Sequence, residues 1–141
     1  MDIIGSIKNK AKGLNKKIIF PEGDDERIKK AVNLAVKQKM IIPILVNESK
    51  IKESKELNRY AKEYAKRFKV SENVAKSIIQ HPLFYSAMAV SIGDADGMIG
   101  GCVYTSGDMI AVSKQIIGLQ KGIKVPSSFF LMSIPKYEGG E

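Results

Sequence analysis

The order of strand-like and helix-like segments near the amino terminus most constrains what this chain can fold into. Lys17–Phe20 is a short, mostly apolar run that Pro21-Glu22-Gly23 ends. Residues 24–40 then carry apolar side chains at helical spacing, with two acids at the start that suit a helix cap. A second short apolar run follows at Ile42–Val46. Strand, helix and strand in this order are typical of a parallel sheet, so the pattern predicts an α/β fold.

The rest of the chain continues this alternation. Further strands are predicted at Gly97–Ile99 and within Val125–Ile134, whose long apolar stretch is typical of a central strand buried on both faces. Helical spacing predicts helices over residues 3–14, 48–70, 83–92 and 106–118, and a short helix that Ser71 opens. No repeat or linker divides the sequence. We therefore expect residues 1–141 to form a single domain, a three-layer α/β/α sandwich with a mainly parallel sheet.

The net charge of +8 raises the question of an anionic partner. Residues 1–80 hold 19 Lys and Arg against 10 Asp and Glu, a balance of +9, whereas residues 81–141 hold 4 against 5, a balance of −1. The basic excess is mixed with acids at helical spacing, which is typical of a solvated face. It would also attract a polyanionic ligand. Nucleic-acid binding is not expected, because no nucleic-acid recognition motif accompanies the charge.

The sequence gives no indication of a membrane or an oxidising compartment. No apolar run approaches the roughly 20 residues that a membrane span needs, and the amino terminus lacks the apolar core of a signal peptide. The single cysteine, Cys102, cannot form an internal disulfide. We expect it to be a small packed residue and the protein to be cytoplasmic.

Glycines and hydroxyl side chains gather where the third predicted strand ends. Gly100 and Gly101 are followed by Thr105-Ser106-Gly107-Asp108 at the start of a predicted helix. Helix amino termini present unpaired N–H groups and a partial positive charge, which suit phosphate. The same residues would equally serve as a helix cap, with Thr105 or Ser106 capping and Asp108 complementing the dipole. The spacing alone leaves both interpretations open.

Three segments together resemble the amino-terminal half of the phosphate acetyltransferase (phosphotransacetylase) and phosphate acetyl-butyryl transferase family. They are Pro21-Glu22-Gly23-Asp24-Asp25-Glu26-Arg27, the run from Gly93-Asp94-Ala95-Asp96-Gly97-Met98 to Asp108, and Ser127-Ser128-Phe129-Phe130-Leu131-Met132. The resemblance implies the first domain of a phosphate acyltransferase-like fold and reversible acetyl transfer between coenzyme A and phosphate. It implies small-molecule partners (acetyl-CoA, phosphate and acetyl phosphate), coenzyme A as substrate with no tightly bound cofactor or metal, and allows a homo-oligomer.

The resemblance also suggests which residues face the substrate. It implies Gly100, Gly101, Thr105 and Ser106 as phosphate-side donors, Asp108 as the residue that positions their turn, and Arg67 within a basic segment that the family uses for anions.

The chain departs from the family pattern in three ways. Ala111 stands where the family has an arginine, with Lys114 one turn further on as a partial substitute. The stretch between Val46 and Tyr60 is shorter than usual. The family's second domain, which carries its catalytic Ser, Arg and Asp, has no counterpart in this sequence. We therefore expect no catalytic residue here and a chain incomplete for catalysis; the alternative is a non-catalytic acyl-phosphate or coenzyme A-binding or regulatory domain derived from that fold.

Overall fold

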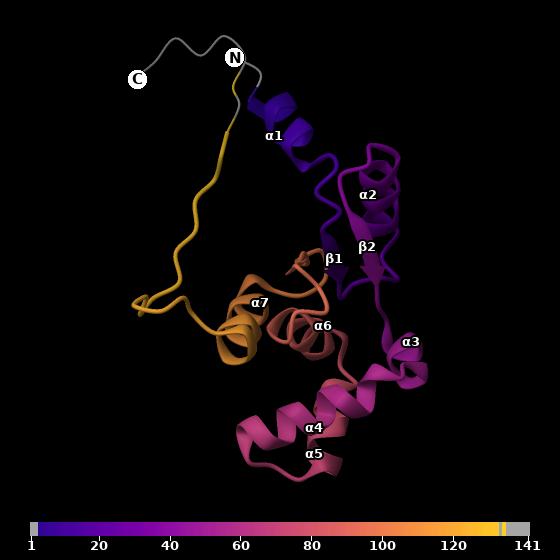
Figure 1. Ribbon diagram of the computed structural model, residues 1–141, viewed down its shortest axis with the longest axis vertical. Helices are drawn as coiled ribbons and strands as arrows, with labels where there is room; N and C mark the ends of the chain where they lie inside the picture. The colour runs from indigo at the N-terminus through magenta and orange to yellow at the C-terminus, as the bar shows by residue number, and fades with distance from the viewer. Residues whose placement is uncertain (1–2, 133, 135–141) are drawn as a thin grey trace.

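The computed structural model describes residues 3–132 and 134. Helices and short strands make up this part of the chain, as Figure 1 shows. In chain order the elements are α1 (Ile3–Ala11), β1 (Lys17–Phe20), α2 (Glu26–Lys37), β2 (Ile42–Leu45), α3 (Glu48–Glu53), α4 (Glu56–Phe68), α5 (Glu72–Ile79), α6 (Pro82–Ser91), β3 (Gly97–Met98), α7 (Ser106–Val112) and the π-helical turn η1 (Ser113–Ile117).

The three strands form one parallel sheet in the order β2-β1-β3. β1 is central: Ile19 is opposite Ile44 of β2 on one side and Met98 of β3 on the other. Parallel neighbours require crossover connections, and α2 supplies the one from β1 to β2. The sheet and its helices confirm the predicted α/β fold.

Both faces of the sheet are covered by helices. Side chains alternate along a strand, so Phe20 packs with Ile28 and Val32 of α2, whereas its neighbour Ile19 belongs to the larger core on the other face. That core is built mainly from α4, α5 and α6. Its buried members include Leu57, Tyr60, Tyr64, Ala75, Ile79, Leu83, Ala87 and Met88.

The charged stretch 48–70 forms two helices where one was predicted. α3 ends at Glu53 and is followed by its C-cap Ser54, whose hydroxyl lies 2.8 Å from that of Tyr85; α4 then begins at Glu56. α4 then packs beside α5 on the far side of α6 from the sheet (Figure 1). None of the helices in the described part of the chain is long and apolar enough to cross a membrane.

The turn before β3 lies at the amino edge of the sheet. The Asp96 carboxylate accepts the Lys17 N–H at 2.8 Å and the Lys16 ammonium at 2.7 Å, which joins the starts of β1 and β3. The Asp94 carboxylate accepts the Tyr60 hydroxyl at 2.5 Å and pairs with Arg59 of α4. Asp94 and Asp96 therefore have structural roles, since their hydrogen bonds join neighbouring elements of the fold. Both lie away from the carboxyl edge of the sheet, where ligands collect in such folds.

The predicted central strand within Val125–Ile134 is wrong for the described residues. Residues 125–132 form no strand, and Phe129 and Phe130 are 89% and 92% exposed. Figure 1 shows this segment, drawn in yellow, as an extended trace that leaves the α7 end of the molecule and runs apart from the sheet. Apolar composition favours burial, but a strand buried on both faces needs a surface on each side, and the large apolar side chains of residues 125–132 are exposed in the described structure.

Candidate functional site

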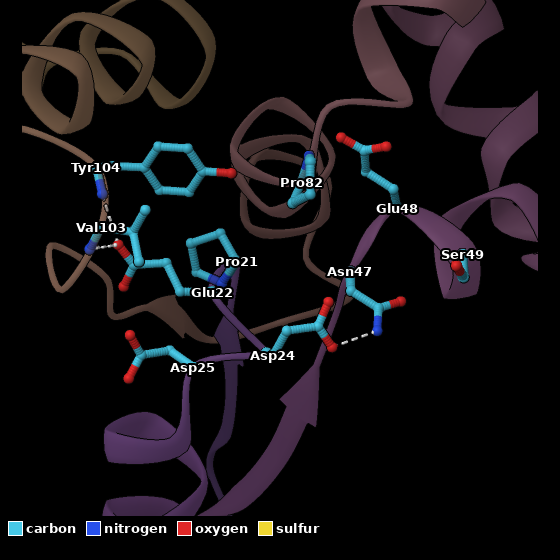
Figure 2. A pocket seen from close by; sticks show the side chains of 11 residues that line it. Pro21, Glu22, Asp24, Asp25, Asn47, Glu48, Ser49, Pro82, Val103 and Tyr104 are labelled. Atoms are coloured by element: carbon cyan, nitrogen blue, oxygen red, sulfur yellow. Dashed lines mark hydrogen bonds between the residues drawn. The ribbon is translucent and has the colours of Figure 1, made fainter.

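The strand order places the candidate site at the carboxyl ends of the strands. In an open parallel sheet of order 2-1-3, the connections run to opposite sides of the first strand, and a crevice forms where the order reverses. Here that crevice lies between the loops that follow β1 and β3. A cavity of about 410 Å³ opens there, lined by Pro21–Asp25 after β1, Asn47–Ser49 after β2, Pro82 of α6, and Val103 and Tyr104 after β3 (Figure 2).

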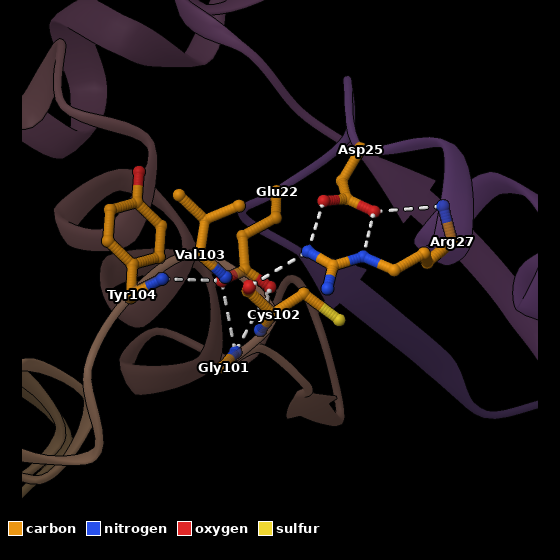
Figure 3. Close-up of polar contacts among 7 residues, drawn as sticks. All are labelled: Glu22, Asp25, Arg27, Gly101, Cys102, Val103 and Tyr104. Atoms are coloured by element: carbon orange, nitrogen blue, oxygen red, sulfur yellow. Dashed lines mark hydrogen bonds and ion pairs between the residues drawn. The ribbon is translucent and has the colours of Figure 1, made fainter.

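A single carboxylate connects the two sides of this crevice. Glu22 is only 6% exposed, and its oxygens accept four consecutive backbone N–H groups of the loop after β3. The donors are Gly101 at 3.0 Å, Cys102 at 3.0 Å, Val103 at 2.7 Å and Tyr104 at 2.8 Å (Figure 3). Successive N–H groups that converge in this way form an anion-binding nest, so loop 101–104 is folded around the charge of Glu22.

These hydrogen bonds also determine the protonation of Glu22. Burial alone raises the pKa of a carboxyl group, but the N–H groups of Tyr104, Val103, Cys102 and Gly101 favour the charged form and together leave the pKa of Glu22 below its ordinary value. Burial raises the pKa of Tyr104, and the negative charges of Glu22 and Glu48 raise it further. Glu22 is therefore a carboxylate, and Tyr104 a neutral phenol, at neutral pH.

Arg27 makes a second connection across the crevice. Its guanidinium pairs with both oxygens of Asp25, at 3.0 and 2.7 Å, and donates to the Cys102 carbonyl at 2.9 Å (Figure 3). Asp25 also caps α2 by accepting the Arg27 N–H at 2.8 Å, which confirms a capping role for this acid cluster. The Arg27 hydrogen bonds hold the pKa of Asp25 at about 2.

The loops after β1 and β2 are held together just as closely. The Gly23 N–H donates to the Val46 carbonyl at 3.0 Å, and a Cβ at this position would lie 2.4 Å from the same oxygen. The Asn47 amide donates to Asp24 at 2.7 Å (Figure 2). Only glycine fits at Gly23, because no side chain tolerates so close a backbone approach.

The predicted glycines lie on the β3 side of the crevice. Gly100 is packed tightly, since a Cβ there would lie 3.1 Å from the side chains of Pro21 and Met109. Gly101 has φ +113°, a conformation that favours glycine, and its N–H donates to Glu22. Cys102 follows and is exposed, so the expectation of a packed cysteine is wrong.

The predicted hydroxyl turn opens α7. The Thr105 side chain accepts the Asp108 N–H at 3.1 Å and donates to the Asp108 carboxylate at 2.7 Å, while that carboxylate accepts the Thr105 N–H. This is a capping box. Ser106 is the first residue of the helix and is exposed, and Ala111, which lies further along the same helix, is exposed as well. Thr105 and Asp108 therefore form the cap of α7.

Arg67 is placed on a different part of the molecule. It lies on α4 and donates to the Ser91 hydroxyl at 3.0 Å and to the Ile116 carbonyl, which joins α4 to α6 and η1. In the described part of the chain, no hydrogen bond or ion pair joins it to residues 100–108. Glu22, which sequence reasoning left without a role, is the residue that reaches them. The sequence feature that could have indicated this role is the position of Glu22 between Pro21 and Gly23, directly after a strand.

The residues of the cavity define what it could hold. Glu22, Asp24, Asp25 and Glu48 make the wall acidic, although no cluster of three or more His, Cys, Asp or Glu side chains in the described residues is arranged to hold a metal ion. The N–H groups of loop 101–104 occupy the Glu22 carboxylate, and Arg27 pairs with Asp25. The negative charges of Asp24 and Glu48 disfavour an anionic ligand in this cavity.

Comparison with known proteins identifies relatives along the whole chain. The sequence model of the phosphate acetyl/butaryl transferases matches residues 2–140. Phosphate acetyltransferase of Clostridium acetobutylicum is 35% identical over 164 residues, covering 100% of this chain and 49% of that protein. The enzyme of Thermoanaerobacterium thermosaccharolyticum is 30% identical, with the same coverage of 100% and 49%. The chain spans about half the length of these curated relatives.

Solved structures show the same fold. A phosphotransacetylase from Streptococcus pyogenes superposes with a TM-score of 0.79 at 23% identity, over 89% of this chain and 46% of that one. The EutD phosphotransacetylase from Staphylococcus aureus gives a TM-score of 0.77 at 25% identity, over 88% and 44%.

Proposed function

The chain belongs to the phosphate acetyl/butaryl transferase family, and from this membership we propose that it takes part in reversible acetyl transfer between coenzyme A and inorganic phosphate. The observation that carries the proposal is the family match over residues 2–140, together with curated relatives that are phosphate acetyltransferases. The substrates are then acetyl-CoA, phosphate, acetyl phosphate and coenzyme A, which acts as substrate and leaves again, and the reaction takes place in the cytoplasm.

The chemistry requires a thiolate and a stabilised oxyanion. The coenzyme A thiol loses its proton to a base, and the sulfur attacks the acetyl phosphate carbonyl. A C–S bond forms, the C–O bond to phosphate breaks, and donors stabilise the charge that develops on the carbonyl oxygen. This chain supplies the phosphate-side wall: the turn at Gly100 and Gly101, and the start of α7 at Thr105 and Ser106, held by Asp108.

The catalytic base and the oxyanion donors are not assigned to this chain. Glu22 is ionised and has both oxygens engaged, Asp108 is used in the capping box, and Ala111 provides neither charge nor hydrogen bond. We propose that residues 1–141 alone turn over acetyl phosphate far more slowly than the roughly 1–1000 per second usual for enzymes.

The alternative function is a non-catalytic domain that binds coenzyme A or an acyl phosphate. Ala111, exposed where the resemblance leads us to expect an arginine, is the observation that favours it. Arginine binds phosphate through paired donors, and alanine has none.

A domain exchange separates the two functions. Residues 1–141 would replace the matching half of the Clostridium acetobutylicum enzyme, and acetyl-CoA formation from acetyl phosphate would be followed for the exchange protein and for residues 1–141 alone. Activity of the exchange protein above that of residues 1–141 alone supports the proposal. A folded, inactive exchange protein whose 1–141 part still binds coenzyme A or acetyl phosphate supports the non-catalytic domain. Absence of both activity and binding contradicts both functions.

A further inference from the structure

We propose that Glu22 is a positioning residue. Its carboxylate acts as an internal anion around which loop 101–104 folds. The loop in turn positions the first turn of α7, to which the proposed function assigns phosphate. The proposal deepens that function and rests on it only for the identity of the ligand. The folding of the loop around Glu22 stands on geometry alone.

The hydrogen bonds leave the carboxylate fully occupied. One oxygen accepts from Val103 at 2.7 Å and Tyr104 at 2.8 Å, the other from Cys102 at 3.0 Å, and Gly101 lies within 3.1 Å of both. A buried charge without such partners is strongly unfavourable, and four N–H groups pointing inward are equally unfavourable without an anion. The loop and the carboxylate therefore depend on each other.

Glu22 is itself held in place from the other side of the crevice. Its carbonyl accepts the Asp25 N–H at 3.0 Å, and the next residue, Gly23, donates to the Val46 carbonyl. These contacts fix Glu22 relative to β1 and β2. Loop 101–104 ends directly before Thr105, so the restraint extends from two strands to the first turn of α7.

No other acid of the cavity has this arrangement. Glu48 lines the same cavity but is exposed, and none of the side-chain hydrogen bonds found among the described residues involves it. Asp25 is engaged with Arg27, and Asp24 with Asn47. Because both oxygens of Glu22 face backbone N–H groups, its role is to position the loop and not to transfer a proton.

The first experiment measures amide hydrogen exchange by NMR in the full chain, in Glu22→Gln and in Glu48→Gln. Each variant removes one negative charge from the same cavity and keeps the side-chain size. In Glu22→Gln the amides of 101–104 should exchange about 10- to 100-fold faster, as expected for loss of charge-assisted hydrogen bonds, while the amides of α4 and α5 stay unchanged. Glu48→Gln should leave all of them unchanged. Equal exchange at 101–104 in the three proteins would overturn the proposal.

Chemical rescue distinguishes an anion requirement from a general packing role. Glu22→Ala vacates the nest, and added formate should restore slow exchange at 101–104, whereas chloride at the same ionic strength should not. A folded Glu22→Ala whose loop is protected without formate would contradict the proposal, and so would one that formate leaves unprotected. If Glu22→Ala does not fold, the Glu22→Gln comparison decides.

A phosphate titration connects the loop to the proposed function. Phosphate should shift the amides of residues 105–108 in the full chain and in Glu48→Gln, and shift them less in Glu22→Gln. If phosphate shifts the 105–108 amide resonances in none of these proteins, the phosphate site is contradicted, while the hydrogen-exchange result still decides the role of Glu22. If phosphate shifts these amide resonances equally in the full chain and both variants, the positioning role of Glu22 is contradicted, while the phosphate site is supported.

Discussion

Pro21, Glu22 and Gly23 together place one buried charge at the carboxyl end of β1. Proline ends the strand because its fixed φ and missing N–H do not extend the ladder. Glycine then lets the backbone reach Val46, and the carboxylate between them collects the loop after β3. Three adjacent residues thus connect all three strands of the sheet.

The close approach at Gly23 gives a stability prediction. In Gly23→Ala the new Cβ would meet the Val46 carbonyl oxygen at 2.4 Å, so the loops must move apart, at the cost of about 1–3 kcal/mol that is usual for overpacking. Gly107→Ala is the matched control, because its Cβ meets only the Thr105 hydroxyl at 3.6 Å and alanine is the better helix former. Urea unfolding should show a loss for the first variant and none for the second. Equal free energies of unfolding for Gly23→Ala and Gly107→Ala would contradict the close approach of Gly23 to Val46.

The lowered pKa of Glu22 gives a pH prediction. A carboxyl group whose pKa is lower in the folded than in the unfolded protein stabilises the fold above the unfolded value, about 4.3 for Glu. That contribution declines as the pH falls through this value and toward the folded pKa. Urea unfolding at a series of pH values should therefore show the full chain more stable than Glu22→Gln near pH 7, with the difference shrinking in acid. A difference that stays constant with pH would contradict the shift.

At the scale of elements, the sequence predicts best where a local pattern decides the structure. Lys17–Phe20 has its observed bounds because Pro21 ends it, and the α7 start is marked by Thr105 and Asp108 at capping spacing. The break between α3 and α4 is missed, since it depends on a contact of Ser54 with Tyr85, 31 residues away in the sequence.

The candidate site follows the same division. That Gly100, Gly101 and Thr105 would follow the third strand and lead into a helix was predicted, because this pattern is local in the sequence. That Glu22 would accept four N–H groups about 80 residues away in the sequence was not, because it depends on how the loop after β3 turns back. For Arg67 the resemblance implied a place in an anion-binding segment, and its described hydrogen-bond partners are Ser91 and Ile116.

The capping box of α7 can be tested as an element. Thr105→Ala removes the side-chain acceptor of the Asp108 N–H and should lower the free energy of unfolding by about 0.5–2 kcal/mol. Thr105→Ser keeps that acceptor and should retain most of the stability, and Ser106→Ala is the control at the next exposed position. If Thr105→Ala and Ser106→Ala unfolded alike, the cap would contribute nothing measurable.

Ala111 offers a test of the anion interpretation of the same helix. Ala111→Arg adds a fork of donors to an exposed position nearly two helical turns after Thr105, within reach of the long arginine side chain, and one charge-assisted hydrogen bond should tighten phosphate binding by about 1.5–3 kcal/mol at best. Ser77→Arg, on the exposed side of α5, adds the same charge elsewhere. Amide shifts at residues 105–108 during phosphate titration measure the effect. A turn that is only a cap would respond in neither variant.

On the scale of the whole molecule, charge and apolar surface are unevenly distributed. The net charge is +8, yet the main cavity is lined by acids, so the basic excess lies outside it. The apolar side chains of the core come mainly from β1, α4, α5 and α6. The large apolar side chains of residues 125–132, in contrast, are exposed. The composition of this segment predicted a buried strand, but burial depends on what surrounds a segment as well as on what it contains.

The exposed segment gives the last prediction. Phe129 and Phe130 are 89% and 92% exposed, so replacing both with alanine removes almost no buried surface and should change the free energy of unfolding by no more than about 0.5 kcal/mol. Leu83→Ala, at a position 1% exposed between α6 and the helical core, should cost about 2–5 kcal/mol. Urea unfolding of the three proteins checks both values. If the double variant lost as much stability as Leu83→Ala, residues 125–132 would be packed in solution as the sequence pattern predicts, and the sheet would have a further strand. Equal stability of the double variant and the full chain, with a large loss for Leu83→Ala, would place the core where the described contacts place it: around Ile19, α4, α5 and α6.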